Sequence, residues 1–184
     1  MDPEIVIRAQ GGDAAAYTVL ATRIADRFLS VARRILRDVY LAEDATQQAL
    51  VSVWRELPRL REPERFDAWA YRILVHACYA EGRHHRRWEP SMRWIGHEAV
   101  APDTLEAVAD RDQIARGFRR LSIDHRTVIV LHYYLDLPLV DVAEILDIPA
   151  GTVKSRLHRG LEAMRASMHA RPDARGRLDP EHSA

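Results

Sequence analysis

A short segment near the carboxyl end of the chain, IPAGTVKSRLHRG (148–160), combines guanidinium, ammonium and hydroxyl groups at helical spacing. The donors expected to share one face of a helix here are Thr152, Ser155, Arg156 and Arg159, with Lys154 and His158 on its shoulders. Arginine grips the O6 and N7 atoms of guanine with two parallel hydrogen bonds, while serine and threonine reach phosphates or base edges. These residue types therefore predict recognition of duplex DNA.

The flanking residues supply the support that such a face needs. The preceding stretch VDVAEIL is expected to form a short helix, and 147–150 a tight turn. An apolar stripe lies opposite the donors on the next helix, at Val153, Leu157, Leu161, Met164 and Met168. One side of that helix packs while the other presents donors, which is typical of the recognition helix of a helix-turn-helix. The alternative is a solvated cationic face on a purely structural helix.

Composition narrows the class of protein. The chain has 184 residues, no formal net charge and a hydrophobic content of 47%, which excludes wholesale disorder. No apolar run approaches the roughly 18 residues of a membrane span, and the single cysteine, Cys78, permits no internal disulfide. We therefore expect a cytoplasmic protein without membrane insertion. Two basic islands, 83–93 and 150–171, flank an acidic stretch, which predicts two separate contacts with a polyanion.

The predicted fold class is all-α, because nearly every segment has helical periodicity and none alternates convincingly as a strand. We expect two small helical domains joined by a flexible linker, the carboxyl-terminal one a helix-turn-helix. The predicted boundaries are 10–88 for the first domain, 89–104 for the linker, 105–170 for the second domain and 171–184 for a disordered tail.

Within the first domain, helices are expected over 24–37, over 41–57 and from Phe66 onward, with a proline-bounded loop between the last two. The apolar stripe predicted for the third helix comprises Phe66, Trp69, Ile73, Ala77 and Ala80. Trp54 and Trp69 are expected to anchor the core, and Cys78 to be a small core residue.

Both halves carry residues that point to one family. The stretch 120–165, with VIVLHYY, DVAEIL and GTVKSRLHRG, closely resembles the promoter-reading domain of bacterial sigma factors, above all the extracytoplasmic-function group. In the amino-terminal half, AEDATQQALVSVW resembles the family's A-E-D-x-x-Q-E-x-F-x-x-x-W helix, and FDAWAYRILVHACYAEGRHHRR resembles its F-x-x-W-L-Y-R-I-A-x-N helix. Gln48 replaces the family's acid, Leu50 its phenylalanine and His76 its asparagine.

The resemblance implies a sigma factor that binds core RNA polymerase and directs promoter-specific transcription initiation. It implies contacts with the polymerase clamp helices at Asp44, Gln47, Gln48 and Arg55. It implies −10 DNA contacts at Arg61, Arg65, Arg72, His76, Tyr79, Arg83, Arg86 and Arg87. The −35 contacts would be Thr152, Lys154, Ser155, Arg156, His158 and Arg159. Apolar residues within 128–137 would meet the polymerase flap, and an anti-sigma factor is left open as a further partner.

No catalytic role is expected. The chain contains no G-x-x-x-x-G-K-[ST], H-E-x-x-H or G-x-S-x-G motif, and His84 and His85 lack further ligands at a closing spacing. We therefore expect no enzyme activity, cofactor or metal. Two alternatives stay open: a helix-turn-helix regulator that binds duplex DNA without being a polymerase subunit, and an interaction module that occupies polymerase without promoter selectivity.

Overall fold

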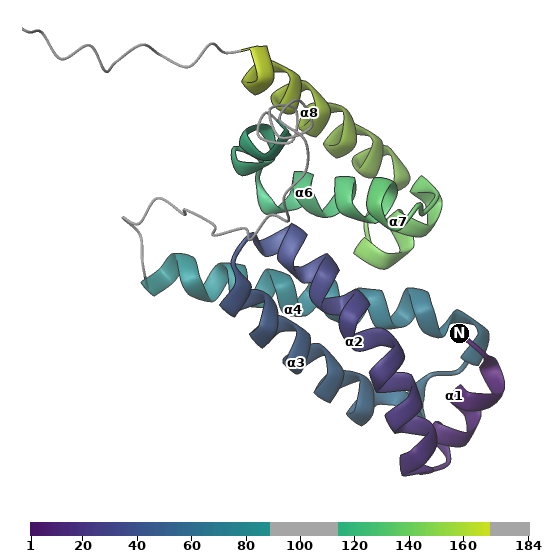
Figure 1. Ribbon diagram of the computed structural model, residues 1–184. Coiled ribbons are helices and arrows are strands. Elements are labelled where there is room, and N and C mark those ends of the chain that lie inside the picture. The colour runs from purple at the N-terminus through teal and green to yellow at the C-terminus, as the bar shows by residue number, and fades with distance from the viewer. Residues whose placement is uncertain (89–113, 170–184) are drawn as a thin grey trace, which may run out of the picture.

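The computed structural model describes residues 1–88 and 114–169, and every regular element within these ranges is a helix (Figure 1). The expected all-α fold class is therefore confirmed. The predicted linker over 89–104 and the predicted tail over 171–184 lie outside the described residues.

The amino-terminal half is a helical bundle whose first three α-helices begin at aspartate caps. Its elements are Pro3–Gln10 (α1), Ala14–Leu36 (α2), Val39–Glu56 (α3), Leu57–Arg59 (η1), Pro63–Arg65 (η2) and Phe66–Trp88 (α4). Asp13 accepts a hydrogen bond from the backbone amide of Ala16 at 3.0 Å, and Asp38 accepts one from the amide of Leu41 at 2.9 Å. Each cap satisfies a backbone donor that has no partner inside the helix, which fixes where the helix starts.

The start of α2 differs from the sequence-based expectation. The helix begins at Ala14 rather than near residue 24, and α1 was not predicted. A turn through Gly12, whose φ of 91° suits glycine, leads to the Asp13 cap and the alanine-rich first turn. α2 is therefore 23 residues long and runs beside α4 (Figure 1).

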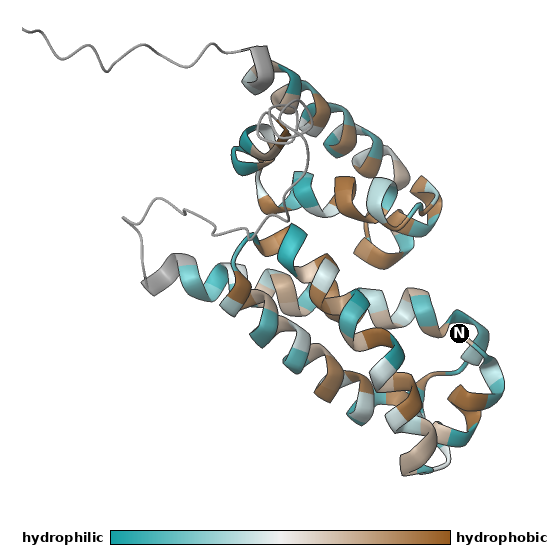
Figure 2. Ribbon diagram, viewed as in Figure 1, coloured by the Kyte–Doolittle hydropathy of each residue, from teal (hydrophilic) through white to brown (hydrophobic). Residues whose placement is uncertain are grey.

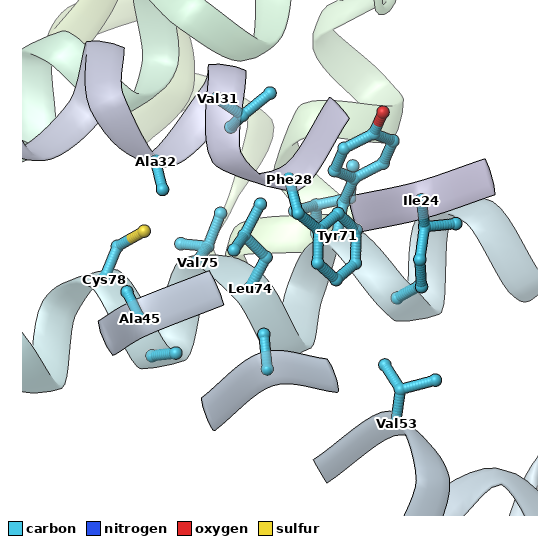
Figure 3. Packing of buried hydrophobic residues seen from close by; sticks show 14 of the residues in the cluster. Ile24, Phe28, Val31, Ala32, Ala45, Val53, Tyr71, Leu74, Val75 and Cys78 are labelled. Atoms are coloured by element: carbon cyan, nitrogen blue, oxygen red, sulfur yellow. The ribbon is translucent and has the colours of Figure 1, made fainter. Parts of the chain in front are cut away.

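The core of this half lies between α2, α3 and α4 (Figure 3). Phe28 of α2 is 1% exposed, and Val53 of α3 and Leu74 of α4 are 0% exposed. α3 contributes mainly short side chains to its buried side, including Ala45 and Ala49. Short side chains at a helix contact allow the two backbones to approach closely.

α4 buries two residues of the predicted stripe, Phe66 and Ala77, but its buried side is otherwise different. Leu74 and Cys78 are fully buried, Trp69 and Ile73 are half-buried, and Ala80 is exposed. The helix contacts α2 and α3 and also helices of the carboxyl-terminal half. Its buried arc is therefore wider than one amphipathic stripe and centred elsewhere on the helix.

Cys78 is confirmed as a core residue, and its burial has a measurable consequence. Burial raises the pKa of the Cys78 thiol to about 12, so the reactive thiolate is scarce near neutral pH. We expect the native protein to resist a maleimide at about pH 8 and to react quickly in denaturant, where the thiol pKa returns to about 8.5. Rapid, complete labelling of the native protein would contradict this packing.

The carboxyl-terminal half contains the expected helix-turn-helix. Residues 114–119 are helical, and the further elements are Ile123–Ile129 (α6), Val130–Tyr134 (η3, a π-helical segment), Leu139–Leu146 (α7) and Ala150–His169 (α8). Asp147 has a φ of 54° and ends α7 in the left-handed conformation. The turn that follows leads directly into α8.

α8 packs closely on α6 at Gly160. A Cβ at this position would lie 3.0 Å from Cδ1 of Ile129 and 3.3 Å from Cβ of His125. The missing side chain therefore permits this approach, and a larger residue would need its neighbours to move.

The two halves are in contact. α4 packs against α7 and α6, while α2 contacts α6 and η3. Buried side chains of both halves belong to one hydrophobic cluster. Hydrophobic and hydrophilic residues are mixed along each helix (Figure 2), as expected for helices with one buried and one exposed side.

Candidate nucleic-acid and protein interfaces

The amino-terminal half of α8 presents a polar, basic surface. Lys154, Ser155, His158 and Arg159 are all exposed there. The hydroxyl of Ser155 donates to the backbone carbonyl of Thr152 at 2.9 Å, and His158 lies 3.3 Å from Glu162 one turn later. This surface carries donors suited to base edges and phosphates, on a helix supported from behind by α6 and α7.

Arg156 lies away from the centre of that surface. Its side chain is 29% exposed, and its Nη2 atom lies 3.6 Å from a carboxylate oxygen of Asp124 on α6. Val153 and Gly160, which are buried, stand three residues before and four residues after Arg156 and therefore share its side of the helix. Thr152, at the edge of the surface, is half-buried. The spacing of Val153 and Gly160 could have indicated this rotation from the sequence.

An exposed strip runs along α3. The predicted protein contacts Asp44, Gln47, Gln48 and Arg55 are all exposed on it. Sequence reasoning missed its apolar members: Val51 is 42% exposed and Trp54 is 44% exposed. The expectation that Trp54 anchors the core was wrong, because its ring packs edge-on against Tyr17 at 4.4 Å, on the rim of the bundle. Polar groups around exposed apolar side chains are typical of a protein-binding surface.

A second basic surface extends from the loop before α4 along that helix. Arg61, Arg65, Arg72, His76 and Arg83 are exposed. The first three of these line a cleft of about 410 Å³ between the two halves, together with residues of α7. The backbones of the predicted contacts at positions 86 and 87 continue α4.

Tyr79 differs from the other predicted contacts on α4. Its side chain is half-buried, and its hydroxyl is buried without a hydrogen-bond partner among the described residues. Burial raises the pKa of this hydroxyl to about 12, and the nearby groups belong to α6 and α8. In this arrangement Tyr79 faces the helix-turn-helix domain rather than solvent.

The apolar segment 128–137 is largely internal. Val128 to Leu131 are buried, so these four residues are not available to a partner. The accessible apolar side chains nearby include Tyr133, Tyr134 and Val140, which are 60%, 44% and 64% exposed. Within the predicted flap contact, only the end of the segment is therefore accessible to a partner.

The described ranges contain neither a metal-binding cluster nor a membrane-spanning helix. Neither 1–88 nor 114–169 brings three histidine, cysteine, aspartate or glutamate side chains together around a possible metal position. Over the same ranges, no helix combines the length and apolarity that crossing a membrane requires.

The fold and these surfaces define a two-domain helical DNA-binding protein, with a helix-turn-helix at one end and a bundle with an exposed strip of mixed polar and apolar side chains at the other. Residues 20–88 match the family model of Sigma-70 region 2, and residues 111–164 match that of Sigma-70, region 4. The chain belongs to the extracytoplasmic-function (ECF) family of RNA polymerase sigma factors.

Individual relatives agree over nearly the whole length. The chain is 32% identical over 165 residues to ECF RNA polymerase sigma factor SigL of Mycobacterium tuberculosis (strain H37Rv), covering 85% of this chain and 93% of the relative. It is 29% identical over 174 residues to ECF RNA polymerase sigma factor SigW of Bacillus subtilis. This match covers 85% of this chain and 91% of the relative.

Solved structures share the fold. CnrH, in complex with the cytosolic domain of CnrY, matches with a TM-score of 0.67 at 22% identity, over 93% of this chain and 99% of that one. The sigma factor RpoE, in complex with the anti-sigma factor NepR from Bartonella quintana, matches with a TM-score of 0.68 at 21% identity. The match covers 85% of this chain and 98% of that one.

Family membership confirms the main function predicted from the sequence. The protein is a non-enzymatic initiation factor that binds core RNA polymerase and promoter DNA and directs promoter-specific transcription. The alternative of a helix-turn-helix regulator that is not a polymerase subunit is not favoured, because the chain matches the two sigma regions in order.

Proposed function

We propose that three surfaces divide the work of initiation. The α3 strip binds the polymerase clamp helices, the loop before α4 together with α4 binds the −10 element, and α8 binds the −35 element. One observation carries the proposal: the exposed donors of α8 and the exposed strip of α3 lie on different domains, so both can be engaged at once.

The −35 element is assigned to the row of exposed donors on α8. Lys154, Ser155, His158 and Arg159 contact the DNA through base edges and phosphates, with Thr152 at the start of the helix. Arg156 completes the set by tying α8 to α6 through Asp124, which orients the helix in the groove.

The −10 element is assigned to the basic surface on α4 and the loop before it. Single-stranded DNA is held by cationic grooves and stacking side chains, and an irregular loop suits the capture of an unstacked base. Arg61, Arg65, Arg72, His76 and Arg83 supply the charge and the polar groups, and Tyr79 supplies an aromatic ring once the two domains separate. Arg86 and Arg87 extend the same basic run.

We place the action of the protein in the cytoplasm, with RNA polymerase, and propose that an anti-sigma factor regulates it. Both solved structures reported above hold a sigma factor in a complex, one with the cytosolic domain of CnrY and one with the anti-sigma factor NepR. Their fold extends over nearly the whole of this chain, so a regulator of that kind could be accommodated here.

Transcription with purified core polymerase tests the assignment as a whole. Adding the protein to core polymerase on genomic DNA should give transcripts with defined 5′ ends, preceded by two shared sequence elements. Transcripts no different from those of core polymerase alone would contradict the proposal. The experiment also supplies the promoter sequences that the other tests need.

The clamp contact is tested by Arg55→Glu on the exposed strip of α3. We expect the affinity for core polymerase to fall about tenfold or more, because reversing a charge inside an interface adds repulsion to the lost contact. Arg23→Glu is the matched control, since Arg23 is exposed on α2 and lies near Asp67 and Tyr71 of α4 rather than on the strip. Equal losses from both variants would show that the strip has no special role.

A further inference from the structure

We propose that Gln10, the last residue of α1, is a positioning residue for promoter recognition: its side-chain amide holds the loop before α4 in the shape that selects the −10 element. The inference rests on the proposed function, because it takes this loop to contact the −10 strand. Residues 20–88 match the family model of Sigma-70 region 2, so Gln10 lies before the matched segment. Gln10 acts through the backbone of the loop and does not itself touch DNA.

The side-chain amide of Gln10 donates to two backbone carbonyls of the loop. Its Nε2 atom lies 2.7 Å from the carbonyl oxygen of Leu60 and 3.1 Å from that of Leu57. A glutamine amide carries two N–H groups on this nitrogen, so each carbonyl can take one of them. The two loop residues stand 50 and 47 positions after Gln10, so the contact joins α1 to a segment far along the chain.

The contact lies where the loop holds itself least. The amide of Leu60 donates to the carbonyl of Leu57 at 3.1 Å, and the amide of Arg65 donates to the carbonyl of Glu62 at 2.9 Å. These bonds close two short turns, η1 and η2, and neither bond spans the junction between them. Gln10 binds the carbonyl of Leu60 at this junction and thereby fixes how the second turn follows the first.

α1 is a firm support for this contact. It lies at the end of the bundle where α3 ends and α4 begins, and it packs against α2, η1 and η2 (Figure 1). Val6 is 0% exposed and Ala9 is 4% exposed, so the inner side of the helix is buried. The amide of Gly11 donates to the carbonyl of Ile7 at 3.1 Å, which closes the last turn of α1. Gln10, in that turn, is therefore held in place before it meets the loop.

The loop presents groups suited to DNA on another side. Arg61 and Arg65 are exposed, and Leu60 and Arg61 line the same cleft as Arg72. None of the described residues of α1 lines that cleft. Because Leu60 directly precedes Arg61, a shift of its carbonyl changes the direction of the Arg61 side chain. Selection of one base over another depends on how precisely such groups are held, so Gln10 affects selectivity without contacting a base.

Gln10→Met tests the contact, because methionine has a side chain of similar length and no donor. Arg8→Met is the matched control. It also places methionine on α1 and also removes two hydrogen bonds, but these run from the exposed Arg8 to Asp13 and not to the loop. Gln10→Lys is the rescue variant, since its ammonium group can donate to both carbonyls.

The first measurement is transcription by holoenzyme from two promoter sets, one with each −10 position varied and one with each −35 position varied. We expect Gln10→Met to reduce discrimination among the −10 variants roughly threefold to tenfold, as the loss of two hydrogen bonds allows. Discrimination among the −35 variants and the affinity for core polymerase should stay at the parental level. Gln10→Lys should restore most of the −10 discrimination, and Arg8→Met should match the parent.

The second measurement reports on the loop directly, in the free full-length protein. Trypsin cleaves after exposed arginines, and Arg59 is exposed in η1, next to Leu60. We expect cleavage at this bond, identified by mass spectrometry, to be roughly threefold to tenfold faster in Gln10→Met than in the parent, because the lost contact raises the population of the locally open loop. Arg8→Met and Gln10→Lys should be cleaved there at nearly the parental rate.

Equal cleavage after Arg59 in Gln10→Met and the parent would overturn the proposal. Equal losses of Gln10→Met on both promoter sets would also overturn it, because a merely structural role gives that result. The −10 assignment of the loop is checked separately by Arg61→Gln, which leaves Gln10 in place. If Arg61→Gln keeps every −10 preference, the proposed function of the loop has failed, whatever the cleavage shows. If Arg61→Gln relaxes −10 preference and Gln10→Met does not, Gln10 is not a positioning residue.

Discussion

Replacing Arg159 with glutamine should weaken holoenzyme binding to the −35 duplex by about 1–3 kcal/mol and relax selectivity at one base pair, because glutamine cannot reproduce the bidentate contact of arginine with guanine. Arg159 is exposed on α8 beside Ser155, on the side of the helix away from the buried Val153. The measurement is binding to a promoter set in which each −35 position is varied in turn, at fixed salt because the phosphate contribution depends on it.

Two further variants separate base contact from other roles. Arg165→Gln changes the same residue type farther along α8 and should leave selectivity unchanged. Arg156→Gln should lower the stability of the helix-turn-helix domain more than it alters base preference, because it breaks the link to Asp124. A promoter profile that Arg159→Gln leaves unchanged, but Arg156→Gln relaxes, would reverse the two roles.

Replacing Phe28 with alanine should reduce the free energy of unfolding by about 3–5 kcal/mol, a large share of the roughly 5–15 kcal/mol that holds a typical domain together. Phe28 is 1% exposed, and its ring centre lies 5.8 Å from that of Tyr71 across the α2–α4 contact (Figure 3). Chemical denaturation followed by circular dichroism measures the loss.

Val19→Ala is the control for this substitution. Val19 lies on the same helix but is 41% exposed, so its truncation should change the unfolding free energy by no more than about 0.5 kcal/mol. If both variants lost equally little stability, Phe28 would not occupy the packed position described here. The contrast isolates burial, because both variants place alanine in α2.

Local patterns were enough to predict most of the helices and the exposed donors of α8. The all-α class, the helix-turn-helix and the exposure of Lys154, Ser155 and Arg159 follow from helical spacing and turn chemistry within a few residues of each position. The polar residues of the α3 strip, in contrast, were named from the family resemblance and not from spacing. The family resemblance then supplied partners that no spacing could indicate.

The length of α2 was missed because the alanine-rich start of the helix has little apolar periodicity, although the Asp13 cap was visible in the sequence. Trp54 was misplaced because an aromatic on an apolar stripe can lie at the rim of a bundle as well as in its centre, and only the position of Tyr17 distinguishes the two. Such errors concern how far an element extends or which part of its face is covered.

The sequence by itself determined which residues form helices and which type of DNA-binding unit they build, since both depend on interactions between near neighbours along the chain. Only the tertiary structure decided that Arg65 meets Glu144 and Arg72 meets Asp147, and that Tyr79 is turned inward. These partners are separated by 79 and 75 residues along the chain for the two ion pairs, and no periodicity relates them. Their meeting depends on how two separately folded surfaces pack, which is a property of shape and charge in three dimensions.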